Sequence, residues 1–130
     1  MIDRLEEKAL IQKAIEAKER SYSPYSKFPV GAALLTEEGR VFVGTNVENS
    51  SYGLSMCAER SAIVSAVSNG YRKFRSIAIV SDRKEPTSPC GACRQFMVEF
   101  GNFEVILVGE ENIKRTTTFE LLPMHFEMEK

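Results

Sequence analysis

The sequence has 130 residues, of which 43% are hydrophobic, and its 17 basic and 18 acidic residues give a net charge of −1. This balance gives no electrostatic reason to expect nucleic acid or a membrane surface as a partner. No apolar run approaches the ~20 residues that span a bilayer, and the amino terminus lacks the basic-then-apolar order of a secretory signal. Three cysteines, an odd number, suit a reducing compartment better than a set of disulfides. We therefore expect one cytoplasmic globular domain over residues 1–130.

The first predicted element is an amphipathic helix over residues 3–21. Asp3 is placed to cap it, and Glu6 follows at the spacing of a capping box. Apolar residues at helical spacing form a stripe that ends at Lys18, so we expect this helix only to cover the core. The stripe consists of Leu5, Ala9, Ile11, Ala14 and Ile15.

A connector and a hairpin follow. Residues 21–29 contain two prolines and three aromatic residues, which predicts an ordered segment without repetitive structure. Residues 30–35 and 41–47 predict two strands joined by a short loop in which Gly39 can adopt a positive φ. Residues 48–56 predict a polar loop.

The second half alternates helices with apolar runs of strand length. The run at residues 76–81 is continuous, as in strands buried on both faces. The predicted elements are helices at 57–69 (ending at Gly70) and 91–100 (ending at Gly101), strands at 76–81, 103–108 and 114–118, and a helical turn at 119–122 that Pro123 stops.

This order gives a hairpin followed by two crossover units. We expect right-handed crossovers to place helices over both faces of the sheet, which predicts an α/β fold, a three-layer α/β/α sandwich with a mixed sheet of about five strands. Both cysteine-containing stretches would then follow a strand and loop and begin a helix, at the rim where α/β sheets usually bind ligands.

All three cysteines lie in two short motifs, Cys57-Ala58-Glu59-Arg60 and Pro89-Cys90-Gly91-Ala92-Cys93. A helix N-terminus lowers the pKa of a thiol and favours the thiolate, which is the species that binds metal. The spacing of Cys90 and Cys93 lets both sulfurs reach one ion, while Cys57 would approach from the facing helix. The only histidine, His125, is distant in sequence. Three cysteines with an open fourth position indicate a catalytic zinc site, where a bound water would have a pKa of roughly 7.

Glu59 and Arg60, which follow Cys57 and Ala58, have roles in such a site. Glu59 would be the general acid and base, although a glutamate in a first helical turn can also simply favour the helix dipole. Three thiolates on Zn²⁺ leave a net charge of −1, and Arg60 could offset this charge by donating hydrogen bonds to cysteine sulfurs.

Other interpretations of the cysteines remain open. A Cys-x-x-Cys pair alone can be a redox dithiol or half of a structural zinc site. A redox dithiol, however, leaves Cys57 and Glu59 without a task.

Together these motifs resemble the zinc-dependent nucleobase and nucleoside deaminases. Their flanks resemble in particular the small homotetrameric cytidine deaminases, and the likeness runs from about Tyr22 to Phe126. Cysteine rather than histidine at position 57 matches the small tetrameric type. The stretches that carry the resemblance are Phe28-Pro29-Val30-Gly31-Ala32, Asn46-Val47-Glu48-Asn49, Cys57-Ala58-Glu59-Arg60, Cys90-Gly91-Ala92-Cys93-Arg94-Gln95 and Leu121-Leu122-Pro123.

The resemblance implies hydrolysis of cytidine and 2′-deoxycytidine to uridine and 2′-deoxyuridine with release of ammonia, a reaction of pyrimidine salvage. One zinc ion per subunit would be held by Cys57, Cys90 and Cys93, and zinc-bound hydroxide would attack C4 of the pyrimidine. Glu59 would move the proton from the water to N3 and then help to protonate the departing amino group.

The resemblance also implies residues that recognise the pyrimidine and the sugar. The backbone near Ser88 would accept a hydrogen bond from the amino group, and the Ala58 N–H would meet the pyrimidine oxygen. Asn46 and Glu48 match positions that hold the ribose 3′-hydroxyl, although both could instead serve loop solvation and turns.

Three aromatic residues match further positions. Phe28 would pack beside the nucleoside, and Tyr52 and Phe126 would reach a neighbouring subunit's site in a homotetramer. Plain core or interface packing is the alternative for all three. The residues around Phe126, Met124-His125-Phe126-Glu127-Met128, depart from the small residues usual before this phenylalanine.

Two other functions compete with this one. The first is a deaminase of a related aminopyrimidine nucleoside such as blasticidin S, or of cytosine in a nucleic acid; the neutral charge argues against the latter. The second is a zinc-stabilised binding module without catalysis.

Overall fold

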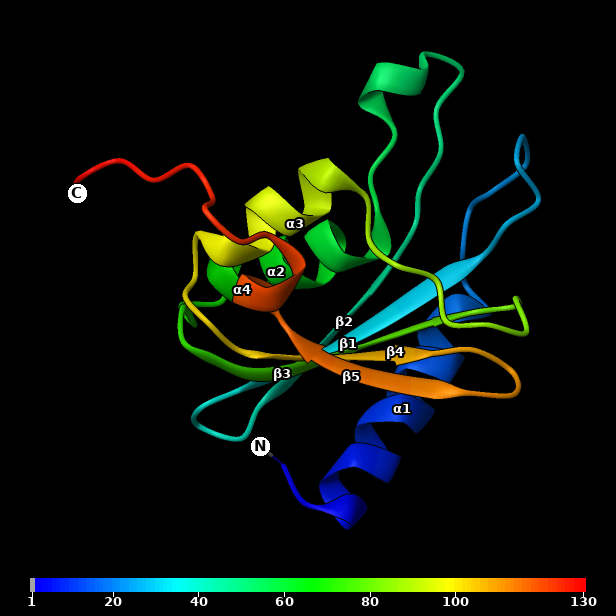
Figure 1. The fold of residues 1–130 in the computed structure, drawn as a ribbon. Helices are drawn as coiled ribbons and strands as arrows, with labels where there is room; N and C mark the ends of the chain where they lie inside the picture. The colour runs from blue at the N-terminus through cyan, green and yellow to red at the C-terminus, as the bar shows by residue number, and fades with distance from the viewer. Residues whose placement is uncertain (1) are drawn as a thin grey trace.

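The protein is described here by a computed structural model that covers residues 2–130 and has a central sheet with helices on both sides (Figure 1). The predicted order of helices and strands is confirmed, with ends displaced by a few residues. The elements are α1 Arg4–Lys18, β1 Val30–Thr36, β2 Val41–Thr45, the 3₁₀ helix η1 Tyr52–Leu54, α2 Ala58–Ser68, β3 Phe74–Ser81, α3 Gly91–Val98, β4 Glu104–Val108, β5 Ile113–Thr117 and α4 Thr118–Leu121.

The sheet has five strands in the order β2-β1-β3-β4-β5. Strands β3 and β4 are parallel and every other neighbouring pair is antiparallel, so the mixed sheet is confirmed. Gly39 has a φ of 92° in the β1–β2 turn, as the hairpin prediction required. The three central strands are buried along almost their whole length, which agrees with the prediction of a strand buried on both faces.

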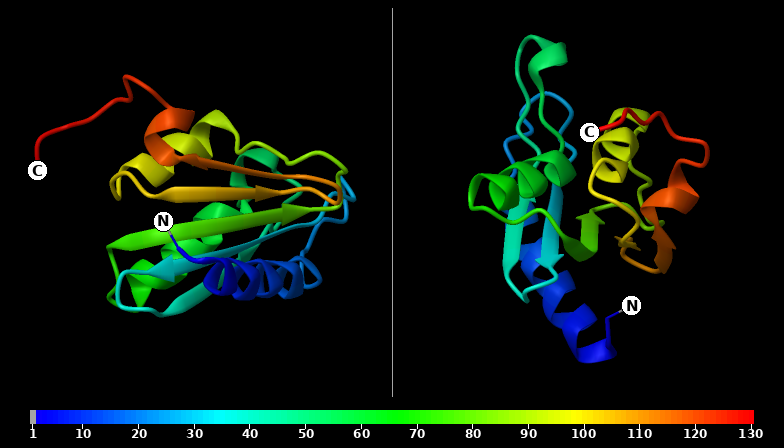
Figure 2. Two further views of the ribbon diagram at one scale, coloured as in Figure 1. Left: turned by 60° about the horizontal axis from the view of Figure 1, so that its bottom comes forward. Right: turned by 90° about the vertical axis from the view of Figure 1, so that its left-hand side faces the viewer.

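The three layers are confirmed. The expectation that the crossovers would place helices over both faces of the sheet is wrong. Both crossover helices, α2 and α3, pack on the same face of the sheet, and α1 covers the other (Figure 2). The first crossover leads from β2 to β3 and the second from β3 to β4, and both move in the same direction across the sheet. Two right-handed crossovers in the same direction put both helices on one side. The second face therefore depends on the N-terminal helix.

The packing forms two hydrophobic clusters, one on each face of the sheet. The larger lies under α2 and α3 and includes three aromatic rings, of Phe42, Phe74 and Phe103. The smaller lies under α1 and consists of Leu10, Ala14, Ala33, Leu35, Ala78, Val80, Ile106 and Val108.

Helix α1 begins with the predicted capping box. The Glu6 N–H donates to Asp3 Oδ1 at 2.8 Å, and the Asp3 N–H donates to the Glu6 carboxylate at 3.3 Å. The predicted apolar stripe is wrong at its start, because Leu5 is 80% exposed whereas Leu10, Ala14 and Ala17 are buried. Leu5 and Leu10 point about 140° apart around the helix axis. No helix within residues 2–130 combines the length and the hydropathy of a membrane span.

Two glycines let helices approach the sheet closely. A Cβ at Gly31 would lie 2.1 Å from the Ala14 carbonyl oxygen of α1. A Cβ at Gly44 would lie 2.4 Å from the Ala58 carbonyl oxygen and equally close to the Ala62 nitrogen. Because such contacts are too short for any side chain, these glycines set the distance between sheet and helices on both faces. Gly44 thereby sets the distance between β2 and α2, the helix whose first turn carries Glu59.

Candidate metal centre and catalytic pocket

The three cysteines converge at the N-termini of α2 and α3. Cys57 is the N-cap of α2, Cys90 is the N-cap of α3, and Cys93 is buried in the first turn of α3. Their three Sγ atoms lie within 4.8 Å of one another, and the group contains no other Cys, His, Asp or Glu from residues 2–130. Tetrahedral Zn²⁺ with thiolates at ~2.3 Å needs sulfurs about 3.8 Å apart. The donor set therefore fits one zinc ion with a fourth position open.

Local backbone structure explains why the cysteines meet. The Ser61 N–H donates to the Cys57 carbonyl at 3.0 Å, and the Arg94 N–H donates to the Cys90 carbonyl at 3.0 Å. The carbonyls of Cys57 and Cys90 thus accept the first hydrogen bond of a helix, while the two cysteine side chains lie outside that helix. The Cys90 sulfur also accepts the Cys93 N–H at 3.5 Å, as an N-cap side chain does. Because α2 and α3 lie on the same face of the sheet, their first turns face each other.

The sulfurs have unequal proton affinities in the absence of metal. A hydrogen bond from the Cys93 thiol, assisted by Arg60, lowers the pKa of Cys57 from 9.0 to about 5. The same hydrogen bond, together with burial and the nearby Glu59 carboxylate, raises the pKa of Cys93. The close contact between Cys57 and Cys93 therefore opposes ionisation of both thiols without a counter-charge, which a divalent cation would supply.

Arg60 lies where the sequence predicted it. Its Nη2 donates to Cys57 Sγ at 3.6 Å and to the Ser55 carbonyl at 3.4 Å. The Cys57 sulfur, through this hydrogen bond and its charge, raises the pKa of Arg60 further. Its Nε is buried and makes no hydrogen bond within residues 2–130. A permanent positive charge therefore contacts the sulfur cluster from the side of α2.

Glu59 is 5% exposed and lies on the wall of a pocket that reaches the cysteines. Burial is the largest cause that raises the pKa of this carboxyl above its ordinary value of 4.5, and the neighbouring Cys57 charge acts in the same direction. A buried carboxyl group with a raised pKa holds a proton more readily than an exposed glutamate does, which suits a general acid and base. Glu59 also lies in the first turn of α2, where a carboxylate favours the helix dipole, so this second role is compatible with the pocket position.

The pocket has a volume of about 220 Å³ and lies between the connector, the start of α2 and the loop before α3. It brings together most of the residues that the resemblance implied. Its walls consist of Phe28, Val30, Asn46, Cys57, Ala58, Glu59, Ile79, Thr87, Ser88, Pro89 and Cys90.

Four residues considered in the sequence lie away from both this pocket and the cysteine cluster, namely Glu48, Tyr52, His125 and Phe126. Glu48 and Tyr52 line a separate surface hollow with Tyr25, and the side chain of Tyr52 is 77% exposed. Phe126 is 70% exposed and is attached to α3 by its carbonyl, which accepts a hydrogen bond from Gln95 at 3.0 Å. The His125 ring stacks on Phe119 at 4.8 Å between centroids, so it is not a ligand of the cysteine cluster.

Sequence reasoning missed the role of Arg94. This guanidinium donates to the Pro89 carbonyl at 2.9 Å, to the Leu121 carbonyl at 2.7 Å and to the Ser88 hydroxyl at 2.5 Å. It thereby fastens the pocket loop to the end of α4. Its position directly after Cys93 was a signal that could have pointed to it.

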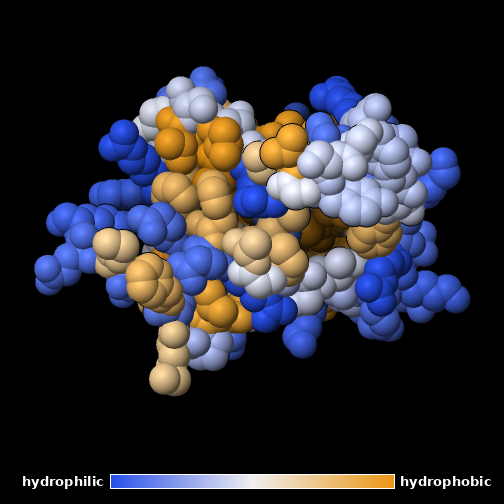
Figure 3. All heavy atoms as spheres, turned by 90° about the horizontal axis from the view of Figure 1, so that it is seen from above, coloured by the Kyte–Doolittle hydropathy of each residue, from blue (hydrophilic) through white to orange (hydrophobic). Residues whose placement is uncertain are grey.

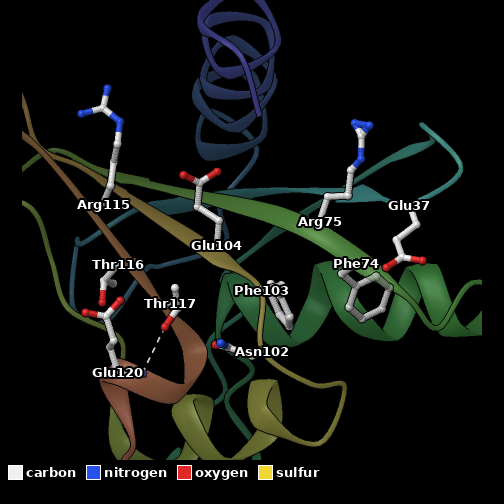
Figure 4. A pocket seen from close by; sticks show the side chains of 10 residues that line it. All are labelled: Glu37, Phe74, Arg75, Asn102, Phe103, Glu104, Arg115, Thr116, Thr117 and Glu120. Atoms are coloured by element: carbon white, nitrogen blue, oxygen red, sulfur yellow. Dashed lines mark hydrogen bonds between the residues drawn. The ribbon is translucent and has the colours of Figure 1, made fainter. Parts of the chain in front are cut away.

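A larger hollow, of about 380 Å³, lies at the other end of the sheet, where β3 and β4 begin (Figure 4). Arg75 and Arg115 project from its rim towards α1, where they form ion pairs with Glu6 and Glu7. Glu104 accepts a hydrogen bond from Ser76 at 3.3 Å. These three charged side chains thus have partners in the chain, and none of the described residues that line this hollow is a cysteine.

Comparison with known proteins agrees with this site. The family described as "Cytidine and deoxycytidylate deaminase zinc-binding region" matches residues 5–109. A cytidine deaminase from Sporosarcina psychrophila is 50% identical over 123 residues, covering 92% of this chain and 90% of that protein. One from Halalkalibacterium halodurans is 48% identical over 128 residues, with 96% and 97% covered.

The solved structures give the same result. The crystal structure of cytidine deaminase from Burkholderia pseudomallei superposes with a TM-score of 0.89 at 50% identity, covering 92% of this chain and 98% of that one. A Bacillus cereus protein named blasticidin-S deaminase is more distant, at 35% identity over 111 residues, 78% of this chain and 79% of that protein. The chain therefore belongs to the cytidine and deoxycytidylate deaminase family.

Proposed function

We propose that this chain is a zinc-dependent hydrolase that deaminates cytidine and 2′-deoxycytidine to the corresponding uridines and releases ammonia. The observation that carries the proposal is the convergence of three thiols beside the buried Glu59 in one pocket. Names of relatives at 50% identity over most of the chain support the same substrate.

The chain's own groups account for the proton transfers. Cys57, Cys90 and Cys93 would hold Zn²⁺, which would supply a nucleophile near neutral pH by lowering the pKa of a bound water. Glu59 accepts one proton of the attacking water and delivers it to N3 of the pyrimidine. It then passes the second proton to the amino group, which leaves as ammonia while the water oxygen becomes the C4 carbonyl.

Other groups in the pocket orient the pyrimidine. The proposed roles are donation by the Ala58 N–H to the pyrimidine oxygen and acceptance from the amino group by the backbone near Ser88, and both residues line the pocket, which supports these roles. Phe28 packs beside the ring. The carboxamide of Asn46 and the carboxylate of Glu48 hold the ribose 3′-hydroxyl, an interaction that the hydrogen bonds described below prepare.

The proposed assembly is a homotetramer in the cytoplasm. Tyr52 and Phe126 are exposed in a single chain. In the proposed tetramer each would contact the pocket of a neighbouring subunit. Figure 3 looks onto the face that carries α2 and α3 and shows apolar side chains exposed among charged ones. Val64 on α2 is 44% exposed. Sedimentation of the purified chain tests the assembly, and a monomeric species with full activity would contradict it.

The decisive test compares Glu59→Gln with the parent chain. We expect the parent to convert cytidine to uridine, followed by loss of pyrimidine absorbance, and to contain one zinc per subunit. Glu59→Gln removes the proton acceptor but no metal ligand. It should therefore keep its zinc and lose turnover by about 10²–10⁴-fold.

Substrate and ligand controls separate the competing functions. Blasticidin S and single-stranded DNA offered in place of cytidine test the two other deaminase specificities. A zinc-stabilised binding module would bind cytidine equally in both chains and convert it in neither.

A further inference from the structure

The connector between α1 and β1 is fastened to the end of β2 and the loop after it by two polar side chains, Asn46 and Glu48. A short parallel bridge pairs Tyr22 with Val47, and the Glu48 N–H donates to the Tyr22 carbonyl at 2.8 Å. Asn46 and Glu48 flank this bridge. Each of them contacts the part of the connector that leads to the pocket residue Phe28.

The Glu48 carboxylate is held by three donors. One oxygen accepts the N–H groups of Tyr25 at 3.0 Å and Ser26 at 3.1 Å, and the other accepts the Ser26 hydroxyl. The Ser26 hydroxyl is the largest cause of the lowered pKa of Glu48. The carboxylate is therefore ionised and oriented before any ligand arrives.

The same hydroxyl also contacts the backbone of Phe28. Ser26 Oγ accepts the Phe28 N–H at 3.0 Å, and Asn46 Nδ2 donates to the Phe28 carbonyl at 2.9 Å. Asn46 Oδ1 accepts the Val30 N–H at 2.9 Å. Both polar groups of the Phe28 backbone are thus occupied, one through Ser26 and the other through Asn46.

The backbone between Ser26 and Phe28 is strained. Lys27 has a φ of 59°, in the left-handed region that residues with a Cβ rarely adopt. Such conformations persist when surrounding interactions hold them, and they gather at functional sites. Here the hydrogen bonds of Ser26 on one side and of Phe28 on the other hold Lys27 in place.

We propose that Ser26 is a positioning residue whose hydroxyl links the Glu48 carboxylate to the Phe28 backbone and so fixes the aromatic wall of the pocket relative to the sugar-binding end. The kinetic consequence rests on the proposed function, whereas the structural link does not. Ser26 is exposed and takes no part in proton transfer or metal binding.

The structural link is tested by hydrogen–deuterium exchange in three variants. Ser26→Ala removes the hydroxyl, Ser26→Thr keeps it, and Ser23→Ala makes the same change at another serine of the connector. We expect the Phe28 amide to exchange at least about tenfold faster in Ser26→Ala than in the parent, because it loses its acceptor. Ser26→Thr and Ser23→Ala should keep the parent rate.

The kinetic consequence is tested with cytidine in the same variants. Ser26→Ala should raise KM by about tenfold with kcat within about twofold, since binding geometry changes and the proton shuttle does not. Ser26→Thr should restore the parent KM. Zinc content should be equal in all four proteins.

Several results would overturn the proposal. The first is a Ser26→Ala protein in which the Phe28 amide exchanges at the parent rate. The second is a Ser26→Thr protein that behaves like Ser26→Ala. The third is a Ser26→Ala protein with faster exchange at Phe28 and an unchanged KM. A parent chain that does not convert cytidine would refute the proposed function instead, and the exchange rates would still decide whether the link exists.

Discussion

Arg60 shows how a single side chain influences the whole metal centre. It donates to Cys57 Sγ and to the Ser55 carbonyl, and it contributes to the pKa of about 5 of the Cys57 thiol. Protons and metal compete for the same sulfur, so the pKa of the sulfur sets how acidic a solution the metal site tolerates.

Arg60→Ala should therefore weaken zinc binding and activity together. Loss of the guanidinium raises the pKa of Cys57, so the acidic limb of the pH–activity profile should move to higher pH. We expect zinc affinity or activity to fall by about 10–100-fold. The measurements are zinc retention against a chelator and kcat/KM between pH 5 and 9.

Two further variants define the Arg60 effect. Arg60→Lys keeps the charge but not the planar fork of donors, so it should lie between the parent and alanine. Arg72→Ala, an exposed arginine after α2, should match the parent. An Arg60→Ala protein with the parent's activity and pH profile would show that Arg60 has no role at the sulfurs.

At the same scale, the convergence of the cysteines could be predicted from the sequence, whereas the surroundings of Glu48 could not. The structure brings Cys57, Cys90 and Cys93 together, as predicted, because few residue types bind zinc and their spacing restricts how they can meet. The prediction for Glu48 named a sugar contact and missed its hydrogen bonds to the connector. Those bonds depend on the path of a non-repetitive segment, which periodicity does not describe.

At the scale of elements, the approach of α2 to the sheet controls the site. Gly44 on β2 lies directly under α2, where any Cβ would lie 2.4 Å from the helix backbone. The first turn of the same helix carries Cys57 and Glu59.

Gly44→Ala should therefore displace α2 and reduce both stability and activity. Overpacking of this kind costs about 1–3 kcal/mol in the free energy of unfolding, measured here by urea denaturation. Gly53→Ala is the matched control, because a Cβ at Gly53 meets no atom within 4 Å. Equal stability of the two variants would contradict the proposed contact.

The arrangement of elements was only partly predictable. Their order and type followed from periodicity, from Gly39 and Gly70, and from the capping box of Asp3 and Glu6. The order of strands in the sheet did not, because a crossover can move in either direction across it. Placement of both crossover helices on one face was therefore missed, although three layers were expected.

At the scale of the whole molecule, ion pairs attach α1 to the end of the sheet remote from the cysteines. Arg115 of β5 contacts Glu7, and Arg75 of β3 contacts Glu6 at 3.1 Å. The hydrogen bond from Arg115 lowers the pKa of Glu7 below its ordinary value of 4.5.

This pair predicts a dependence of stability on pH. Because the folded pKa of Glu7 is depressed, its contribution is fully present above a pH of 4.5 and is lost as the pH falls through the folded pKa. The parent should be more stable than Glu7→Gln at pH 7, and the difference should shrink as the pH falls below 4.5 and through the folded pKa. Free energies of unfolding at these pH values provide the check, and a constant difference between the two proteins would refute it.

One helix alone shields the face of the sheet formed by Ala33, Leu35, Ala78, Val80, Ile106 and Val108. Acid that neutralises Glu7 removes its ion pair with Arg115 and so loosens this cover before it disrupts the two crossover helices on the opposite side. These strands are apolar on this face, and once uncovered they would expose an apolar surface that favours association between copies of the chain. Mild acidification should therefore cause turbidity while the helical circular dichroism signal is still largely intact.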